Sequence, residues 1–182
     1  MSNLQVVNIV GSGAFDLELD LAALSNTLGG IAEYEPEIYP AMYLRVCGQD
    51  GPLATIYGTG KFIIVGSDNK DNLFYVKEEV AAAITEAIEQ PINVEWFEIQ
   101  NYVHKGDIGR ELDLNALTID LGLTKIEYEP EQFPGIIYRS DEYGCVVLIF
   151  RSGKVVVTGT ESKSDAETAY REIIEQIEEL FE

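Results

Sequence analysis

The chain has 182 residues, 46% of them hydrophobic, and its 32 Asp and Glu against 12 Lys and Arg give a formal net charge of -20. This apolar content excludes a disordered polyelectrolyte and suffices for a sizeable core in one large or two small domains. Acid excess argues against phosphate binding through Lys and Arg, but molar salt removes most of that attraction anyway. The composition therefore favours a halophilic protein with a hydrated acidic surface over an ordinary acidic cytosolic protein.

One sequence unit occurs twice. Residues 33–45 read EYEPEIYPAMYLR, and residues 127–139 read EYEPEQFPGIIYR. A Gly-Lys pair follows each copy, at Gly60-Lys61 and at Gly153-Lys154, and the offset between the copies is 94 residues at the start of the match and 93 at its end. The sequence therefore predicts two tandem repeats, residues 1–91 and residues 92–182.

In chain order, the first repeat begins with alternating apolar residues that predict a strand over Leu4–Val10, ended by Gly11 and Gly13. Asp20 is placed to cap a short helix, which Gly29-Gly30 ends. A strand at Ile31–Glu37 follows, and then a turn bracketed by prolines, which restrict the backbone and remove ladder donors.

The rest of the first repeat predicts three more strands, at Ala41–Val46, Leu53–Tyr57 and Lys61–Val65, joined by short glycine-containing turns. Apolar residues then recur at helical spacing from Leu73 to Ile88, which predicts a long amphipathic helix ending near Glu89. Residues 90–93 are the predicted linker.

The second repeat predicts the same order: a strand at Glu95–Val103, a short helix near Asp113–Leu121, a strand at Thr124–Glu129 and three strands that end at Thr158. Its last helix is expected to begin with a capping box at Ser164 and Glu167. The side chains expected to face inward from that helix are Tyr170, Ile173, Ile174, Ile177, Leu180 and Phe181.

Strands joined by such short turns must be antiparallel, because a parallel return needs a long crossover. The predicted fold is α+β: ten antiparallel strands with helices on one face. Side chains alternate across a strand, so if Phe62 and Ile64 pack under the helix, Ile63 and Val65 point to the other face. By the same phase, the outward residues elsewhere are Asn8, Val10, Asn101, Val103, Val156 and Thr158, opposite the inward Val155 and Val157. An uncovered apolar face of this kind is typical of a binding surface.

Several motifs favour structural roles. His104, the one histidine, is predicted to be a solvated residue at a strand end, and no Cys or second His accompanies it for a metal site. Cys47 and Cys145 do not match between repeats, which argues against a disulfide. GTGK at residues 58–61 and SGK at residues 152–154 lack the Ser or Thr of a phosphate loop and are predicted to be hairpin turns. No pair of carboxylates stands apart as a general acid and base, so the chain is predicted not to be an enzyme.

The start of the chain has no basic segment and no apolar run of the kind that signal peptides carry. An intracellular, cytoplasmic protein without membrane contact is expected.

The second copy carries the most distinctive motifs: QNYV at residues 100–103, YEPEQFPGIIYR at residues 128–139 and VVLIFRSGKVVVTG at residues 146–159. Through these motifs the chain, from Leu4 to about Phe181, resembles the conserved core of the TATA-binding protein family, general transcription factors of archaea and eukaryotes, in the acidic form expected of salt-loving archaea. The resemblance implies a saddle-shaped sheet with helices on the convex face. It also implies that the concave face lies in the minor groove of double-stranded TATA-box DNA, bends it, and nucleates the transcription preinitiation complex near the nucleoid.

The resemblance also implies roles for residues of the second repeat. Phe133 and Phe150 would be wedges between base steps, and Asn101 with Thr158 would reach acceptors in the groove. Phosphates would meet Arg139 and Lys154. The residues implied to lie flat against sugars and base edges are Val103, Leu148 and Val156.

In the first repeat the pattern differs. The wedge positions hold Tyr39 and Tyr57, and Val65 and Thr55 stand where the second repeat has Thr158 and Leu148. The equivalents that are retained are Asn8, Val10, Arg45, Lys61 and Ile63. A buried hydroxyl without a partner costs about 1–3 kcal/mol, and valine cannot donate to a base, so weaker or altered recognition by the first repeat is expected.

The minor groove of an A·T pair offers only acceptors, and guanine adds an amino donor, so amide and hydroxyl donors on an apolar floor suit A·T sequences. Bland alternatives remain for individual residues. Phe133 and Phe150 could be core aromatics, Asn8 and Asn101 turn residues, and Arg139 and Lys154 partners of carboxylates.

The family recruits transcription factor B through the second-repeat turn, which implies contacts from Glu129, Glu131 and Gln132; the family usually has leucine at the position of Gln132. A homodimer of the free protein through the open face is left open. The alternative function is that of a diverged saddle paralogue that mainly binds protein as a transcription regulator. A third class, an enzyme or small-molecule carrier on a similar scaffold, would need an enclosed pocket between helices and sheet.

Overall fold

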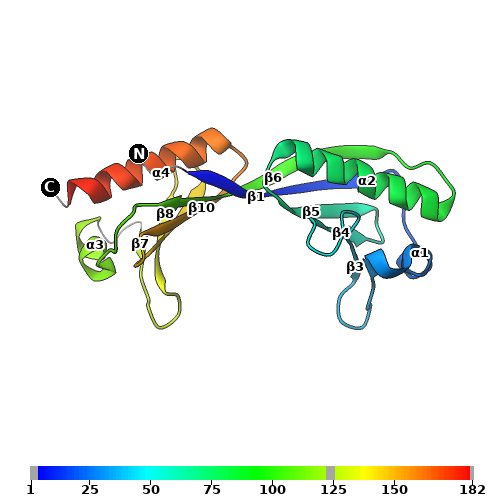
Figure 1. Ribbon diagram of the computed structural model, residues 1–182, viewed down its shortest axis with the longest axis horizontal. Coiled ribbons are helices and arrows are strands. Elements are labelled where there is room, and N and C mark those ends of the chain that lie inside the picture. Colours follow the sequence, from blue (N-terminus) through cyan, green and yellow to red (C-terminus); the bar gives the residue numbers. More distant parts are fainter. Residues whose placement is uncertain (1–3, 122–125, 181–182) are drawn as a thin grey trace. The chain divides into compact units, whose positions relative to one another are not determined.

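The computed structural model describes residues 4–121 and 126–180 (Figure 1). Each repeat contributes five strands and two α-helices, as the sequence predicts. The elements of the first repeat are β1 (Gln5–Phe15), α1 (Leu21–Leu28), the 3-10 turn η1 (Gly29–Ile31), β2 (Ala32–Glu33), β3 (Ala41–Leu44), β4 (Leu53–Tyr57), β5 (Lys61–Ser67) and α2 (Lys70–Ile88). Those of the second are β6 (Val94–Asp107), α3 (Leu114–Asp120), β7 (Ile126–Glu127), β8 (Gly135–Ser140), β9 (Cys145–Phe150), β10 (Lys154–Thr160) and α4 (Lys163–Glu179).

All ten strands belong to one sheet, in the order β2-β3-β4-β5-β1-β6-β10-β9-β8-β7. The pairs within each repeat are antiparallel, and neighbours along the chain are joined by short turns, so the predicted α+β class is confirmed. No helix in the described part of the chain is both long enough and apolar enough to cross a membrane.

The chain forms two compact units. The first unit is Asn8–Gln100, and the second unit is Asn101–Glu182 together with the first seven residues. The long strands β1 and β6 each contribute residues to both units. In the first unit α2 packs on β5 and α1 packs on α2 and β3, whereas in the second unit α4 packs on β9 and β10 and α3 on β8.

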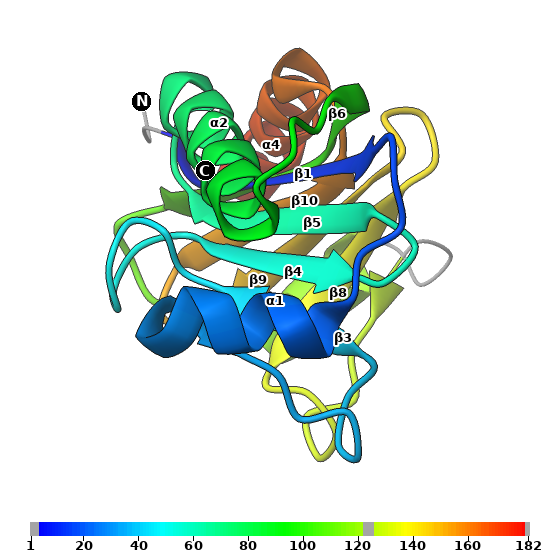
Figure 2. The same ribbon diagram turned by 90° about the vertical axis from the view of Figure 1, so that its right-hand side faces the viewer.

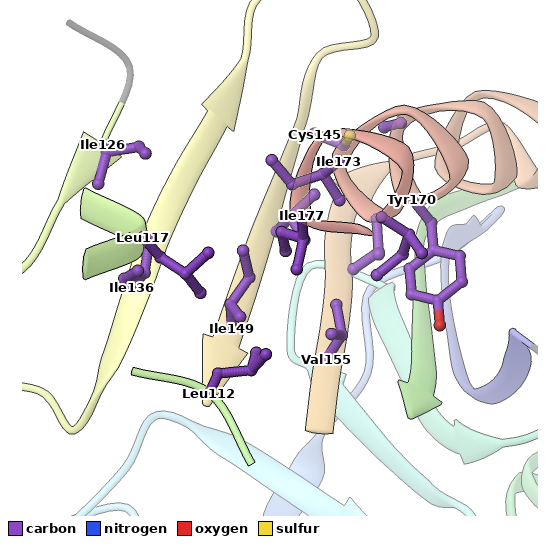
Figure 3. Close-up of a cluster of buried hydrophobic side chains, with 14 of the residues drawn as sticks. Leu112, Leu117, Ile126, Ile136, Cys145, Ile149, Val155, Tyr170, Ile173 and Ile177 are labelled. Carbon is purple, nitrogen blue, oxygen red and sulfur yellow. The ribbon is translucent and has the colours of Figure 1, made fainter. Parts of the chain in front are cut away.

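The helices cover one face of the strands in each unit. In the first unit Phe62 and Ile64 are fully buried and Ile63 and Val65 are half-buried, which confirms the predicted alternation. In the second unit the inward residues of α4, such as Ile173 and Ile177, lie against strand residues that include Ile149 (Figure 3). Within the first unit, Figure 2 shows α2 on the side of the strands away from the β2–β3 turn, and within the second unit it shows α4 on the side away from the β7–β8 turn.

Side-chain capping sets the start of several helices. The carboxylate of Asp20 accepts from the Ala23 amide at 3.0 Å, and Asp113 caps α3 in the same way. The prediction for α4 was wrong by two residues: Ser162 is the cap, accepting from the Asp165 amide at 3.2 Å, and Ser164 lies inside the helix. Satisfying free amide donors in the first turn stabilises each helix by about 1 kcal/mol.

Other predicted bounds were also wrong. The strand expected over Ile31–Glu37 is reduced to the two residues of β2. Leu180, expected to face inward, is 42% exposed because α4 has already ended. Phe181 and the start of the strand expected at Thr124–Glu129 lie outside the described residues.

The prediction that Gly11 and Gly13 end the first strand was wrong, because β1 continues to Phe15. Both glycines lie where residues of β6 come too close for a side chain. A Cβ on Gly11 would lie 2.4 Å from Cζ of Phe97, and one on Gly13 would lie 2.6 Å from the carbonyl oxygen of Trp96. The Phe97 ring stacks on Phe62 with centroids 5.8 Å apart. An aromatic ring thus occupies the volume that a side chain on Gly11 would need.

The equivalent of Gly11 in the second repeat is His104, and the prediction that it is solvated was wrong. The side chain is fully buried, stacks on Tyr102 at 5.9 Å, and neither ring nitrogen has a hydrogen-bond partner among the described residues. The equivalent of Phe97 is Leu4, a smaller side chain that packs on the second-unit core.

Burial lowers the pKa of His104, with Glu167 opposing the shift and Lys163 adding to it from α4. Above about pH 6.5 the imidazole is neutral in the folded and unfolded states. Below that pH the unfolded chain binds the proton and the folded chain does not, so we expect stability to fall until the pH passes the folded pKa. Each unit of pKa difference corresponds to about 1.4 kcal/mol.

Unfolding by denaturant at pH 8 and pH 5 checks this expectation. His104→Leu should lose less stability between the two pH values than the wild type. Carboxylates titrate mainly below this window, and the comparison with the variant removes their contribution. Equal losses in both proteins would show that His104 is not responsible.

Candidate nucleic-acid interface

The face of each unit that its helices leave uncovered is the candidate interface. In the first unit a row of paired residues crosses it, with Tyr43 opposite Thr55 and Thr55 opposite Ile63. In the second unit the matching row is Ile137, Leu148 and Val156. All six side chains are half-buried by their neighbours, and the face is mainly apolar.

Two phenylalanines meet on this face of the second unit. The ring centroids of Phe133 and Phe150 are 5.7 Å apart, with the planes tilted by 58°. Neither ring belongs to the buried core, which removes the alternative that they are core aromatics. A Cβ on Gly135 would lie 3.1 Å from an atom of each ring, so the missing side chain lets both rings approach the backbone of β8.

Tyrosines occupy the same place in the first unit. The hydroxyls of Tyr39 and Tyr57 are 2.8 Å apart and share a hydrogen bond, which raises the pKa of Tyr57 and keeps it protonated. The Tyr39 ring also stacks on Tyr43, with centroids 5.6 Å apart and planes 11° apart. The hydroxyls of Tyr39 and Tyr57 are thus satisfied in the free protein by each other.

The two asparagines lie inside strands β1 and β6, so the alternative that they form turns was wrong. Asn101 accepts from the Gly159 amide at 2.8 Å, and its amide nitrogen donates to Thr158 at 3.0 Å. Asn8 accepts from the Gly66 amide at 2.7 Å, and Val65 replaces the threonine. Both side chains are therefore fixed through their oxygen, and the Asn101 amide nitrogen is also held by its bond to Thr158.

The cations on this face differ between the repeats. Arg139 pairs with Glu127 at 3.0 Å, and Lys154 pairs with Asp107. These hydrogen bonds lower the pKa of both carboxyls. The alternative that these cations are held by acids is thus correct for the free protein.

In the first unit Arg45 donates to the carbonyl of Gly51 at 2.7 Å. Ala14 lies opposite Lys61 at the position where Asp107 lies opposite Lys154. Within residues 4–121 and 126–180, Lys61 has no carboxylate at ion-pair distance.

Strand phase places fifteen of the eighteen predicted residues on the uncovered face or its border, while Arg45 follows the end of β3 and Tyr39 and Phe133 lie in the turns before β3 and β8. The eighteen residues form two matching sets. The first-unit set is Asn8, Val10, Tyr39, Arg45, Thr55, Tyr57, Lys61, Ile63 and Val65. The second-unit set is Asn101, Val103, Phe133, Arg139, Leu148, Phe150, Lys154, Val156 and Thr158. Sequence reasoning missed Tyr43, Ile137 and Gly135, although the alternation in β3 and β8 could have found them. It also missed Asp107 and Glu127, because strand pairing was needed to bring these acids to their cations.

The β2–β3 and β7–β8 connections are similar turns. Amides at Gln132 and Phe133 donate to the carbonyl of Glu129 at 2.9 Å, and the first repeat repeats this pattern at its equivalent positions. The Gln132 side chain donates to the Glu129 carboxylate. The first-repeat residue equivalent to Gln132 is Ile38, whose side chain is 78% exposed. At this turn position the exposed apolar side chain is therefore in the first repeat, and the second repeat has a polar one.

The two Gly-Lys motifs are hairpin turns, as predicted. Gly60 has φ of 83° and Gly153 has φ of 81°, and their amides donate to Tyr57 and Phe150 at 2.9 Å. Both cysteines are free, Cys47 exposed and Cys145 buried. Within the described residues no group of three His, Cys, Asp or Glu could hold a metal ion.

Fold and face together define the class: a tandem-repeat sheet protein with helices on one side of each unit and a mainly apolar face that these helices leave uncovered. The family model for transcription factor TFIID, or TATA-binding protein, matches residues 3–87 and 96–180, one match for each repeat. The chain belongs to the TATA-binding protein family.

Similar proteins span the whole chain. TATA-box-binding protein C of Halobacterium salinarum is 38% identical over 97% of this chain and 98% of its own length. TATA-box-binding protein 2 of Haloferax volcanii is 40% identical over 98% of this chain and 95% of its own. The solved structure of Methanococcus jannaschii TBP matches with a TM-score of 0.78 and 36% identity, covering 97% of this chain and 99% of that one. The haloarchaeal relatives agree with the halophilic interpretation of the acidic composition.

Proposed function

We propose that this protein binds the minor groove of A/T-rich promoter DNA, bends it with aromatic rings and nucleates assembly of the transcription preinitiation complex. The observation that carries this proposal is the pair Phe133 and Phe150, two rings held together on an uncovered sheet face instead of in the core. Rings in this position can enter a base step and replace lost base stacking without a polar atom to satisfy.

The polar groups of the face suit the same ligand. Asn8 and Asn101 keep their oxygens bonded to the protein, and the Asn101 amide nitrogen gives one N–H to Thr158. The Asn8 amide and the second N–H of Asn101 would be the donors, and A·T pairs offer only acceptors in the minor groove. Half-buried apolar side chains such as Val156 and Ile63 would cover sugars and base edges. Affinity would then come mainly from apolar contact, which a protein with a net charge of -20 can supply.

The cations would contribute less to DNA affinity than the apolar contacts do. Arg139 and Lys154 must leave Glu127 and Asp107 before they can meet phosphates, and exposed ion pairs of this kind are weak and are screened further by salt. We expect Lys61 and Arg45 to reach phosphates without breaking an ion pair.

We further propose that the turn with Glu129, Glu131 and Gln132 contacts transcription factor B. Support comes from its exposed acidic side chains and from the family to which the chain belongs. The hydrogen bond between Gln132 and Glu129 would have to break, or the partner would have to bind the hydrogen-bonded pair of side chains as it stands.

Binding of fluorescently labelled TATA and scrambled duplexes in molar potassium chloride tests the proposal. We expect the TATA duplex to bind at least tenfold more tightly, a difference of about 1.4 kcal/mol. Equal affinities would reject promoter recognition and favour the alternative of a saddle protein that mainly binds other proteins.

A further inference from the structure

The uncovered faces of the two units differ at four positions in the same way. Four positions that hold hydrocarbon side chains in the second repeat hold hydroxyl-bearing side chains in the first. The first-repeat residues, which we call the hydroxyl row, are Tyr39, Tyr43, Thr55 and Tyr57, and their second-repeat equivalents are Phe133, Ile137, Leu148 and Phe150. We propose that the hydroxyl row lets the first repeat accept a G·C base pair in its half of the DNA site, whereas the second repeat accepts only A·T pairs. This inference rests on the proposed minor-groove function.

The four side chains form one contiguous patch. Tyr39 bonds to Tyr57 through the hydroxyls at 2.8 Å and stacks on Tyr43 at 5.6 Å. Thr55 lies directly opposite Tyr43 on the neighbouring strand. Within residues 4–121 and 126–180 no hydrogen bond engages the hydroxyl of Thr55 or of Tyr43. The patch therefore has hydroxyls that can bond to a ligand without breaking a contact in the protein.

The matching patch of the second unit has no polar side-chain atom. Ile137 lies opposite Leu148, and the two phenylalanine rings lie beside them over Gly135. The two patches therefore differ in hydrogen-bonding capacity.

The two patches differ in whether they can accept a hydrogen bond from guanine. Its amino group is a donor in the minor groove, in addition to the acceptors that every base pair offers there. A hydrocarbon floor covers that amino group and leaves it without a partner, which disfavours G·C. A hydroxyl accepts one hydrogen bond and donates another, so it can satisfy the guanine amino group and still serve a neighbouring acceptor.

Two further differences act in the same direction. Val65 removes the hydroxyl that Thr158 supplies in the second repeat, so the first repeat loses a donor to A·T acceptors. The Tyr39 and Tyr57 hydroxyls must leave each other to enter a base step. A·T acceptors can take both O–H donors, but only the guanine amino group can donate to the hydroxyl oxygen that lost its donor, so a G·C pair satisfies the separated hydroxyls more completely.

A panel of duplexes tests this inference. Each A·T pair of an all-A·T reference site is replaced singly by G·C, and affinities are measured in molar potassium chloride. We expect one half of the site to tolerate G·C with less than a threefold loss and the other half to lose tenfold or more. To identify the half that faces the first unit, an iron-chelate cleavage reagent is attached to Cys47, which is exposed, while Cys145 is buried and stays unlabelled.

Matched variants separate the hydroxyl row from other causes. Thr55→Leu with Tyr57→Phe replaces two of the four hydroxyl-bearing side chains by those of the second repeat, and it should impose tenfold discrimination against G·C in the tolerant half. The reciprocal variant, Leu148→Thr with Phe150→Tyr, should relax discrimination in the strict half. Each readout is a ratio of affinities for one protein, so a general loss of binding does not imitate it.

The outcomes distinguish this inference from the proposed function. If the wild type prefers the all-A·T site but rejects G·C equally in both halves, or if tolerance persists in Thr55→Leu with Tyr57→Phe, the inference is wrong and the proposed function stands. If the wild type does not prefer the A·T site over scrambled DNA, the proposed function itself is wrong.

Discussion

Phe133→Ala should weaken binding to a TATA duplex by about 10- to 100-fold, because stacking of a base on an aromatic side chain contributes about 1–3 kcal/mol. Phe150→Ala should have a similar effect, since the two ring centroids are 5.7 Å apart and the proposed function has both rings enter one base step. Neither ring lies in the buried core, so thermal unfolding should change little.

The matched control is Tyr39→Ala in the first repeat. Tyr39 is 37% exposed and bonded to Tyr57, and its hydroxyl must lose that partner on insertion between bases. We therefore expect a loss of only a few fold on the same duplex, measured by fluorescence anisotropy. Equal losses in the Phe133 and Tyr39 variants would contradict the asymmetry between the repeats.

Gly153→Ala should be the most destabilising small substitution in the β9–β10 hairpin. Its φ is 81°, and a Cβ there would lie 2.2 Å from the carbonyl oxygen of Arg110, a backbone atom that cannot rotate away. Left-handed backbone in a non-glycine residue costs about 1–2 kcal/mol and overpacking about 1–3 kcal/mol, so we expect a loss of about 2–5 kcal/mol. This is a large part of the stability of an ordinary domain.

Gly109→Ala isolates the backbone contribution. Gly109 has φ of 80°, almost the same as Gly153, but nothing lies within 4 Å of its added Cβ. Its loss should be about 1–2 kcal/mol. Thermal unfolding in molar potassium chloride measures both variants, and equal melting temperatures for the two would show that the close approach to Arg110 is relieved at no cost.

Much of the fold was predictable from local sequence. The repeat defined two matching series of elements, Asp20 and Asp113 marked the starts of short helices, and the period of two residues in β5 and β10 separated Phe62 from Ile63 and Val155 from Val156. These signals lie within a few residues of the structure that they predict, so no tertiary information is needed.

The errors arose where distant residues decide the result. The sequence predicts that the strand ends at Gly11, and only the tertiary structure shows that the Phe97 ring fills the space beside this glycine. His104 reads as a polar strand end, but as the equivalent of Gly11 it occupies core volume under α4. The acids that hold Arg139 and Lys154 come from β7 and β6, and only strand pairing reveals them.

Bending of DNA tests the central claim most directly. A TATA duplex with a donor and an acceptor dye at its two ends is titrated with the protein across a series of potassium chloride concentrations. Our interpretation predicts that energy transfer rises on binding, because rings inserted from an uncovered sheet face kink the duplex, and that Phe133→Ala with Phe150→Ala lowers this rise even when the duplex is saturated. Saturated binding with the energy transfer of free DNA would contradict it.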